Sequence, residues 1–320
     1  MKNAMLVGIV AAVLAAISWS LSFIVPFVIG NYSLFDFILV AFVFSGFLSL
    51  GILWKNAQTV RMLKPSDWLA ACSLGVIGYV GYYLAVMGAA MYAGPVIAPA
   101  FLGLVPVVLA IAGNLHERTV SWKALALPLT LATVGLLLVN ASGFAESSAL
   151  DTRSLLIGIP LAILAVALWT TFGLLNQSAL AKRPRMDAIV WAALIMVGAG
   201  LAMLVFLPIG ILAGLFEIPR LGLRWDVAAP LIIWGAALAI FANVGGAMAW
   251  TFASQRLPVA LSAQLITMEP TSATVLGLLV HRRWPSVAEV VGIAVLLTGV
   301  VIAIGVFTRS TNEAVTPAVA

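Results

Sequence analysis

The chain has little charge. Only 8% of its 320 residues are Asp, Glu, Lys or Arg, whereas an ordinary soluble domain carries about 25%. So few charges cannot coat the surface of a soluble protein of this length, which argues against a cytosolic enzyme, a secreted module and a nucleic-acid binder. The basic balance does not alter this conclusion, because the net charge at pH 7 is only +5.

Residues that hold metals or carry covalent chemistry are also scarce. A single cysteine, Cys72, excludes an internal disulfide and a cysteine-based metal site. No group of His, Cys, Asp and Glu has metal-ligand spacing. The sequence contains no Walker A loop, no Gly-x-Ser-x-Gly elbow and no HExxH motif. We therefore expect no catalytic residue, no metal, no cofactor and no nucleic-acid partner.

Hydrophobic sequence is abundant: apolar residues make up 63% of the chain and the mean hydropathy is +1.17. A helix needs about 20 apolar residues to cross the hydrocarbon core of a bilayer. The sequence predicts an all-α integral membrane protein of about ten transmembrane helices. The expected spans are 4–29, 34–54, 67–91, 95–115, 120–140, 154–178, 187–213, 227–254, 258–280 and 285–307.

The Lys and Arg residues of the connections predict the orientation. With the N-terminus in the cytoplasm, the 16 Lys and Arg residues divide 11 to 5 in favour of the cytoplasmic side. Cytoplasmic loops are normally richer in these residues. We therefore expect both termini in the cytoplasm, with residues 309–320 as a disordered tail.

The two halves of the chain resemble each other. Trp19 and Trp169 stand in similar surroundings, and Pro95 opens the fourth span as Pro258 opens the ninth. Five spans per half is an odd number, so the second copy must enter the membrane from the opposite side. Such inverted repeats are typical of secondary transporters, whose sites lie near the bilayer midplane. The expected units are a first repeat at 1–140, a linker loop at 141–153 and a second repeat at 154–308.

Motifs in both halves carry a resemblance to a known family. The first half has Gly94-Pro95, Leu104-Val105-Pro106 and His116-Glu117-Arg118, and the second has Leu257-Pro258 and Met268-Glu269-Pro270. Together with the ten spans, these motifs resemble the EamA-type branch of the drug/metabolite transporter superfamily over nearly the whole chain. The resemblance implies export of small metabolites, often amino acids, and therefore a place in the bacterial inner membrane. His281-Arg282-Arg283 departs from the family pattern, which often has an acidic residue there.

Glu269 is the sharpest candidate for transport chemistry, because it is the one acidic residue deep in an expected span. An ionised carboxylate there costs about 2.5–3.5 kcal/mol on insertion scales. The side chain should therefore face a wet cavity, be protonated or pair with a cation, and no Lys or Arg lies at comparable depth. We expect Glu269 to interact with a substrate amine or a coupling proton. The alternative is a protonated carboxyl group that donates a hydrogen bond to a neighbouring helix.

Aromatic residues supply the expected walls of a binding cavity. Three tyrosines share one face of the third span, and a tryptophan occupies the same place in each repeat. Such side chains suit an amphipathic solute through stacking or cation–π contact, although an aromatic stripe in a helical bundle is also common packing. The predicted substrate-binding residues are Trp19, Tyr79, Tyr82, Tyr83, Trp169, Asn243 and Glu269.

Prolines are the expected hinges, since proline removes a backbone donor and allows a helix to bend. We predict that Pro99, Pro106 and Pro270 take part in gating.

Polar residues close to the span ends have more ordinary interpretations. Asp36 and Asp187 are predicted helix N-caps. His116 and His281 lie where interfacial anchoring and proton relay are both open.

The function that the sequence favours is a secondary transporter, which exports a small amphipathic metabolite, an amino acid or a related compound, by alternating access with Glu269 as a candidate proton site. Its partners would be that small molecule and the lipid bilayer, and a homodimer is compatible with the sequence. The alternatives are a flippase for a lipid-linked substrate and a non-transporting membrane scaffold. A membrane-embedded transferase would need a tighter cluster of polar residues at an interface than the sequence offers.

Overall fold

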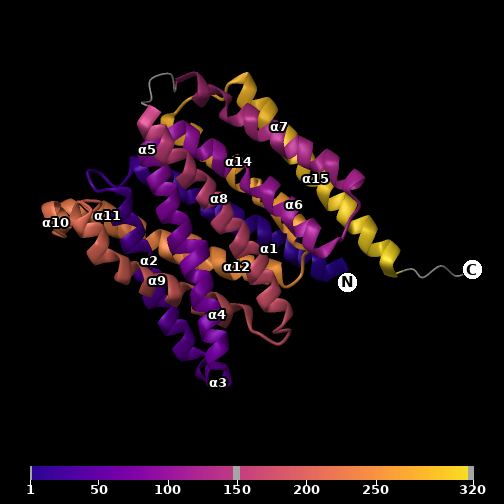
Figure 1. Cartoon of the computed structure of the whole chain (residues 1–320), viewed down its shortest axis with the longest axis horizontal. Helices are drawn as coiled ribbons and strands as arrows, with labels where there is room; N and C mark the ends of the chain where they lie inside the picture. Colours follow the sequence, from indigo (N-terminus) through magenta and orange to yellow (C-terminus); the bar gives the residue numbers. More distant parts are fainter. Residues whose placement is uncertain (1, 147–151, 316–320) are drawn as a thin grey trace, which may run out of the picture.

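The computed structural model (Figure 1) describes the backbone of residues 2–146 and 152–315. Within these ranges, the side chains of residues 2–3, 94–100, 141–146, 152, 281 and 311–315 are not described. Every regular element of the described residues is helical, which confirms the expected all-α class.

The first half of the chain contains one short 3₁₀ segment, η1, and one π-helical segment, η2, between α-helices. The elements are α1 (Lys2–Ser20), η1 (Leu21–Phe27), α2 (Leu34–Lys55), α3 (Ala57–Arg61), α4 (Pro65–Gly75), η2 (Val76–Gly81), α5 (Tyr82–Leu102), α6 (Val105–Glu117) and α7 (Trp122–Glu146).

The described second half resembles the first but has no 3₁₀ segment, and its third span again contains a π-helical segment, η3. The elements are α8 (Thr152–Ala181), α9 (Ala188–Leu212), α10 (Ile218–Leu221), α11 (Trp225–Leu238), η3 (Ala239–Gly245), α12 (Gly246–Ser254), α13 (Val259–Ile266), α14 (Met268–His281) and α15 (Val287–Val315).

The helices are long and apolar enough for a membrane protein. Nine stretches of the described residues meet the length and hydropathy of a transmembrane helix, and α6 is a shorter apolar helix. Together they account for the ten spans that the sequence predicts.

Helices of one half pack mainly against helices of the other. α2 packs on α9, α6 on α13 and α7 on α15, so that equivalent spans of the two halves meet. α1 packs on α12 while α8 packs on α5, which is the same contact with the halves exchanged. Figure 1 shows α7 and α15 side by side along one edge of the molecule. This pairing is what two inverted copies related by a pseudo-two-fold axis produce.

Small residues permit the closest of these contacts. A Cβ atom built on Gly292 of α15 would lie 2.8 Å from the Val139 backbone nitrogen and 3.0 Å from the Gly135 carbonyl oxygen of α7. No side chain fits at that separation, so glycine is what lets the two backbones touch.

Two of the expected spans are broken in the middle. The expected connection at 92–94 lies inside α5, which runs on to Leu102, and the helix stops instead at Gly103 and Leu104 before α6 begins. The expected ninth span likewise divides at Thr267 into α13 and α14. Pro106 and Pro270 each lie in the first turn of the helix that follows the break, where the missing N–H is tolerated. Proline by itself does not set the breaks, because Pro128, Pro160, Pro208 and Pro230 lie inside continuous helices.

The caps of α2 and α9 were predicted with unequal success. Asp187 is the N-cap of α9 and accepts hydrogen bonds from the Ile189 and Val190 amides. For Asp36 the prediction was wrong, because Ser33 is the N-cap of α2 and Asp36 is the third helical residue. Their side chains accept hydrogen bonds from each other's backbone amides, which forms a capping box.

The connections are shorter than expected. α7 continues to Glu146 and α8 begins at Thr152, so only 147–151 of the expected linker remain, and they lie outside the described residues. α15 continues to Val315 into the expected tail, since each added residue of a formed helix gains a hydrogen bond. Residues 316–320 are not described.

Candidate functional site

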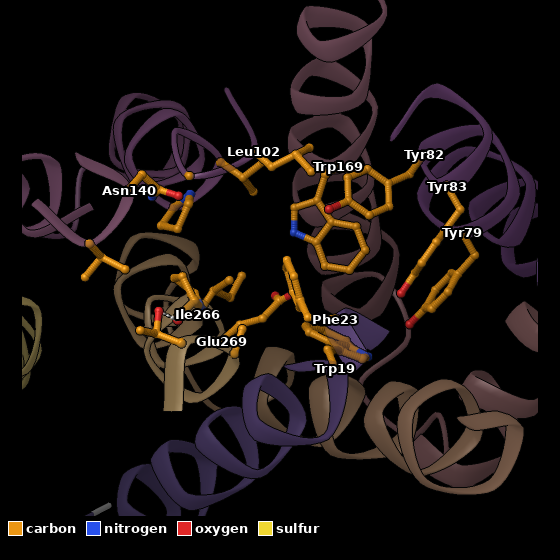
Figure 2. A pocket seen from close by; sticks show the side chains of 17 residues that line it. Trp19, Phe23, Tyr79, Tyr82, Tyr83, Leu102, Asn140, Trp169, Ile266 and Glu269 are labelled. Carbon is orange, nitrogen blue, oxygen red and sulfur yellow. Dashed lines mark hydrogen bonds between the residues drawn. The ribbon is translucent and has the colours of Figure 1, made fainter. Parts of the chain in front are cut away.

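A cavity of about 240 Å³ lies where the two broken spans meet. Its walls come from both repeats, with the ends of α1 and η1, the segment from η2 to α5, and helices α7 and α8 completing them. Figure 2 shows the side chains around this space. The lining residues are Trp19, Phe23, Tyr79, Tyr82, Tyr83, Leu102, Gly103, Val105, Pro106, Val139, Asn140, Trp169, Ile266, Glu269, Pro270, Ala273 and Thr274.

The aromatic wall of the cavity is organised around Trp169. The ring centroid of Trp169 lies 5.1 Å from that of Trp19, with the rings nearly perpendicular, and 5.0 Å from that of Tyr82. Tyr83 continues the wall at 5.3 Å from Tyr82. These separations are typical of favourable edge-to-face and tilted aromatic pairs. The two tryptophans that the internal repeat matched therefore meet at one site, as do the tyrosines of the third span.

Tyr79 sits deeper than its two neighbours. Its side chain is only 2% exposed, and its ring packs on Phe172 and Phe42 at centroid distances of 5.4 Å and 6.3 Å. Among the described residues its hydroxyl group has no hydrogen-bond partner. Tyr79 lies on the π-helical segment η2, and π-helical turns recur at functional sites.

Glu269 faces the aromatic wall from the opposite side of the cavity. It lies in the first turn of α14, immediately after the break at Thr267. Figure 2 shows its side chain extending from α14 into the space beside Phe23 and toward Trp169. No hydrogen bond or ion pair of its carboxyl group is found in the described part of the chain. Burial therefore opposes its charge, while the dipole of α14 favours a negative group at this end of the helix.

Asn243 lies elsewhere. It belongs to η3, is 4% exposed, and donates a hydrogen bond of 2.9 Å from Nδ2 to the Ser45 hydroxyl of α2. It does not line the cavity, so the structure gives it an interhelical contact instead of the expected place in the wall.

Phe23 and Asn140 are two of the lining residues that the sequence analysis did not predict. Nothing in the sequence marks Phe23, in η1, as a lining residue, because it is one phenylalanine among many apolar residues of a predicted span. Asn140, near the end of α7, is a polar residue in a predicted span, which was a usable signal. Its Nδ2 atom donates to the Leu136 carbonyl oxygen at 2.8 Å, so its own carboxamide oxygen is left as an acceptor.

Two of the three predicted gating prolines lie at the breaks. Pro106 and Pro270 both line the cavity, one in the first turn of α6 and the other in the first turn of α14. Pro99 is part of α5, but its side chain lies outside the described residues.

At the other end of α1, a carboxylate joins the two repeats. Glu117, the last residue of α6, accepts hydrogen bonds from the Gln177 side chain of α8 at 2.8 Å and from the Val259 amide of α13 at 2.9 Å. The same Gln177 Nε2 atom also donates to the Leu257 carbonyl oxygen at 2.9 Å. We call these residues the Glu117 junction. It closes the space between α6, α8 and α13 on this side.

A second, polar pocket of about 740 Å³ lies outside the Glu117 junction. It is formed by the end of α8, the end of α12 and the residues that follow α6. His116 is exposed beside it, at the end of α6, and the side chain of His281 lies outside the described residues. No group of three His, Cys, Asp or Glu side chains in the described residues could hold a metal ion.

Comparison with known proteins agrees with this architecture. The model of the EamA-like transporter family matches the chain twice, at residues 6–141 and 156–305. The chain is 28% identical over 317 residues to a protein described as "Inner membrane protein YtfF" from Escherichia coli strain K12, covering 94% of this chain and 95% of that one. A solved crystal structure of a protein superposes with a TM-score of 0.74 over 97% of this chain and 99% of that chain, at 18% identity, which shows a shared fold.

Proposed function

The chain belongs to the EamA-like transporter family, and from this premise we propose that it is a secondary transporter, which exports a small amphipathic metabolite, an amino acid or a related compound, by alternating access. The observation that carries the proposal is the cavity shared by the two repeats, with one broken helix from each repeat in its wall. Broken helices that meet between inverted repeats are the usual place for a transported substrate. The proposal assigns no catalytic residue.

We place the protein in the bacterial inner membrane, on the description of its relative and the family match, with both termini in the cytoplasm. The cavity adjoins the C-terminal end of α1, and the Glu117 junction lies beside its N-terminal part, where Gly8 approaches Leu257. In this orientation the Glu117 junction closes the cytoplasmic side. The conformation would then be one in which the substrate site has lost its access to the cytoplasm.

Glu269 is the proposed coupling residue. The ionisable groups that face it across the cavity are the hydroxyl groups of Tyr82 and Tyr83 on α5. A proton on Glu269 removes its charge, and a bound amine compensates that charge. Proton and amine therefore compete for one carboxylate, and such competition is enough to exchange one for the other across the membrane.

The broken helices are the proposed moving parts. α6 and α14 each begin at the cavity and end at a residue with a left-handed backbone, Arg118 (φ 51°) and Arg282 (φ 50°). Each helix is thus a separate rigid piece that can tilt at its proline-bearing first turn. We keep Pro106 and Pro270 as gating residues on this basis, and Pro99, inside α5, remains a prediction from the sequence.

The proposal is tested by reconstituting the protein in liposomes and measuring flux of radiolabelled amino acids and amines with and without a pH gradient. We expect Glu269→Gln to retain exchange of internal for external substrate but to lose pH-driven accumulation. Glu217→Gln is the matched control, because it makes the same change in a surface side chain that pairs with Arg220. Equal pH-driven flux in Glu269→Gln would refute the coupling role, and absence of flux for every compound would refute transport of this class.

A further inference from the structure

The charge inventory of the cavity is one-sided. Of the 17 residues that line it, Glu269 is the one acidic side chain and none is Lys, Arg or His. We propose that the cavity selects a small organic monocation, with its ammonium group between Glu269 and the aromatic wall and with no free carboxylate. This inference rests on the proposed transport function and narrows its substrate to compounds whose acid group is missing or blocked.

The first argument concerns electrical neutrality. An unpaired charge buried away from water is costly, and pairing with an opposite charge removes much of that cost. A monocation and the Glu269 carboxylate are neutral together. A zwitterionic amino acid would bring its own carboxylate into the same space, where the described lining residues offer it no cationic partner.

The second argument concerns the polar atoms that remain. Asn140 presents a carboxamide oxygen and Glu269 two carboxylate oxygens, all of which accept hydrogen bonds. The donors are neutral: the hydroxyl groups of Tyr79, Tyr82 and Tyr83, which can also accept, and the indole N–H groups of the tryptophans. The start of α6 is a further positive end, but Pro106 deprives its first turn of one amide. The one charged hydrogen-bonding group of the lining is therefore an acceptor, and it suits the N–H groups of an ammonium ion better than a carboxylate.

The third argument is the aromatic wall itself. Three of its rings form a row in space: Trp169 lies in the middle, with its ring centroid 5.0 Å from that of Tyr82 and 5.1 Å from that of Trp19. A cation within about 6 Å of a ring centroid is attracted by the negative face of the ring, most strongly for tryptophan. An ammonium group beside Glu269 on the facing wall would thus be held by two independent kinds of interaction.

The volume limits the size of the ligand. Pockets for drug-sized molecules measure roughly 300–1,000 Å³, and this cavity measures about 240 Å³. It suits an amine with a single ring or a short apolar chain.

The experiment uses the purified full chain in detergent and a matched set of probes with one ring. Phenethylamine and phenylalaninol are cations at neutral pH, phenylalanine is the zwitterion with the same ring, and 3-phenylpropionate is the anion. Binding is measured by isothermal titration calorimetry at neutral pH. We expect both cations to bind at least about tenfold more tightly than phenylalanine, and 3-phenylpropionate to bind most weakly.

Variants test whether the preference comes from the residues named. Glu269→Gln should weaken the cations about tenfold or more and abolish the preference over phenylalanine, while Glu217→Gln should leave it unchanged. Tyr82→Leu keeps the carboxylate but removes one ring, and should weaken the cations with a smaller loss for phenylalanine. It also provides a second test if Glu269→Gln does not fold.

Phenylalanine binding as tightly as phenylalaninol would overturn the inference. Cation binding that is indifferent to Glu269, or no binding of either cation at millimolar concentration, would also overturn it. The transport proposal fails separately. Flux of amino acids without flux of cations in liposomes would support transport and refute the cation preference. Glu269-dependent cation binding with no flux of any compound would support the cation preference and refute transport.

Discussion

Glu117→Gln is the change that tests whether the Glu117 junction holds one side of the protein closed. The carboxylate of Glu117 accepts one hydrogen bond on each oxygen, from the Gln177 side chain and from the Val259 amide. A glutamine at 117 has a carbonyl oxygen in place of one carboxylate oxygen and an amide NH₂ group in place of the other. It can therefore accept from one donor, and it turns an N–H group toward the other.

The size of the effect follows from the type of bond lost. A hydrogen bond to a charged group contributes about 1.5–3 kcal/mol, and a donor facing a donor adds to the loss. Since the bonds join α6 and α8 to α13, they exist only while this side is closed. Each 1.4 kcal/mol is a factor of ten in an equilibrium, so Glu117→Gln should raise the population that is open on this side about 10- to 100-fold.

Thiol labelling measures that population. Ser254 lines the polar pocket beside the junction but is only 6% exposed, so a cysteine at 254 should react slowly in the closed state. In a Cys72→Ala background, which removes the native thiol, we expect Ser254→Cys to react at least about ten times faster with a water-soluble maleimide when Glu117→Gln is added. Glu217→Gln is the matched control and should leave the rate unchanged. An unchanged rate in a folded Glu117→Gln variant would refute the closing role of the junction.

Three further predictions concern stability and pH. Asp36→Ala removes the acceptor of three backbone amides and should lower the free energy of unfolding by about 3 kcal/mol or more. Unfolding in urea or SDS measures this free energy. A loss below about 1 kcal/mol would contradict the role of the buried capping box. Gly292→Leu forces the backbones of α7 and α15 apart and should cost about 1–3 kcal/mol in the same assay, whereas Gly277→Leu, where an added Cβ meets no atom within 4 Å, should cost little. Tyr32, outside the spans, has a pKa above its usual 10.0, chiefly because of burial and then because of the negative Asp36. The unfolded chain therefore loses this proton first, so stability should fall as pH rises above about 10, and Tyr32→Phe, which has no such proton, should remove that part of the decline.

How far sequence reasoning reached differs between the fold and the site. The spans were predictable, because hydropathy is a local property and the bilayer sets a length. The sequence also allowed three residues of the site to be predicted, Trp19, Trp169 and Glu269. The internal repeat related the two tryptophans, and the cost of burying a carboxylate singled out Glu269. Their role as substrate-binding residues remains a prediction.

The misses have a common cause in contacts that are distant along the chain. Asn243 looks like any polar residue inside a span until Ser45, almost two hundred positions earlier, is found to accept its hydrogen bond. The same holds for Glu117, whose partners belong to the other repeat. Asp36 was a different kind of miss, because the Ser33-x-x-Asp36 spacing of a capping box was present in the sequence and was passed over.

One difference between the two repeats has a consequence for kinetics. Val105 and Glu269 occupy equivalent positions, each beside its proline and each lining the cavity, yet only one carries a charge. Two identical inverted copies would give inward and outward states of equal energy, and a carrier half-saturated at the same concentration on either face. Under the proposed alternating access, a carboxylate on the second repeat alone would present a different site to each compartment, so the half-saturation concentrations on the two faces should differ. Exchange would then run at unequal rates in the two directions while still ending at the same equilibrium.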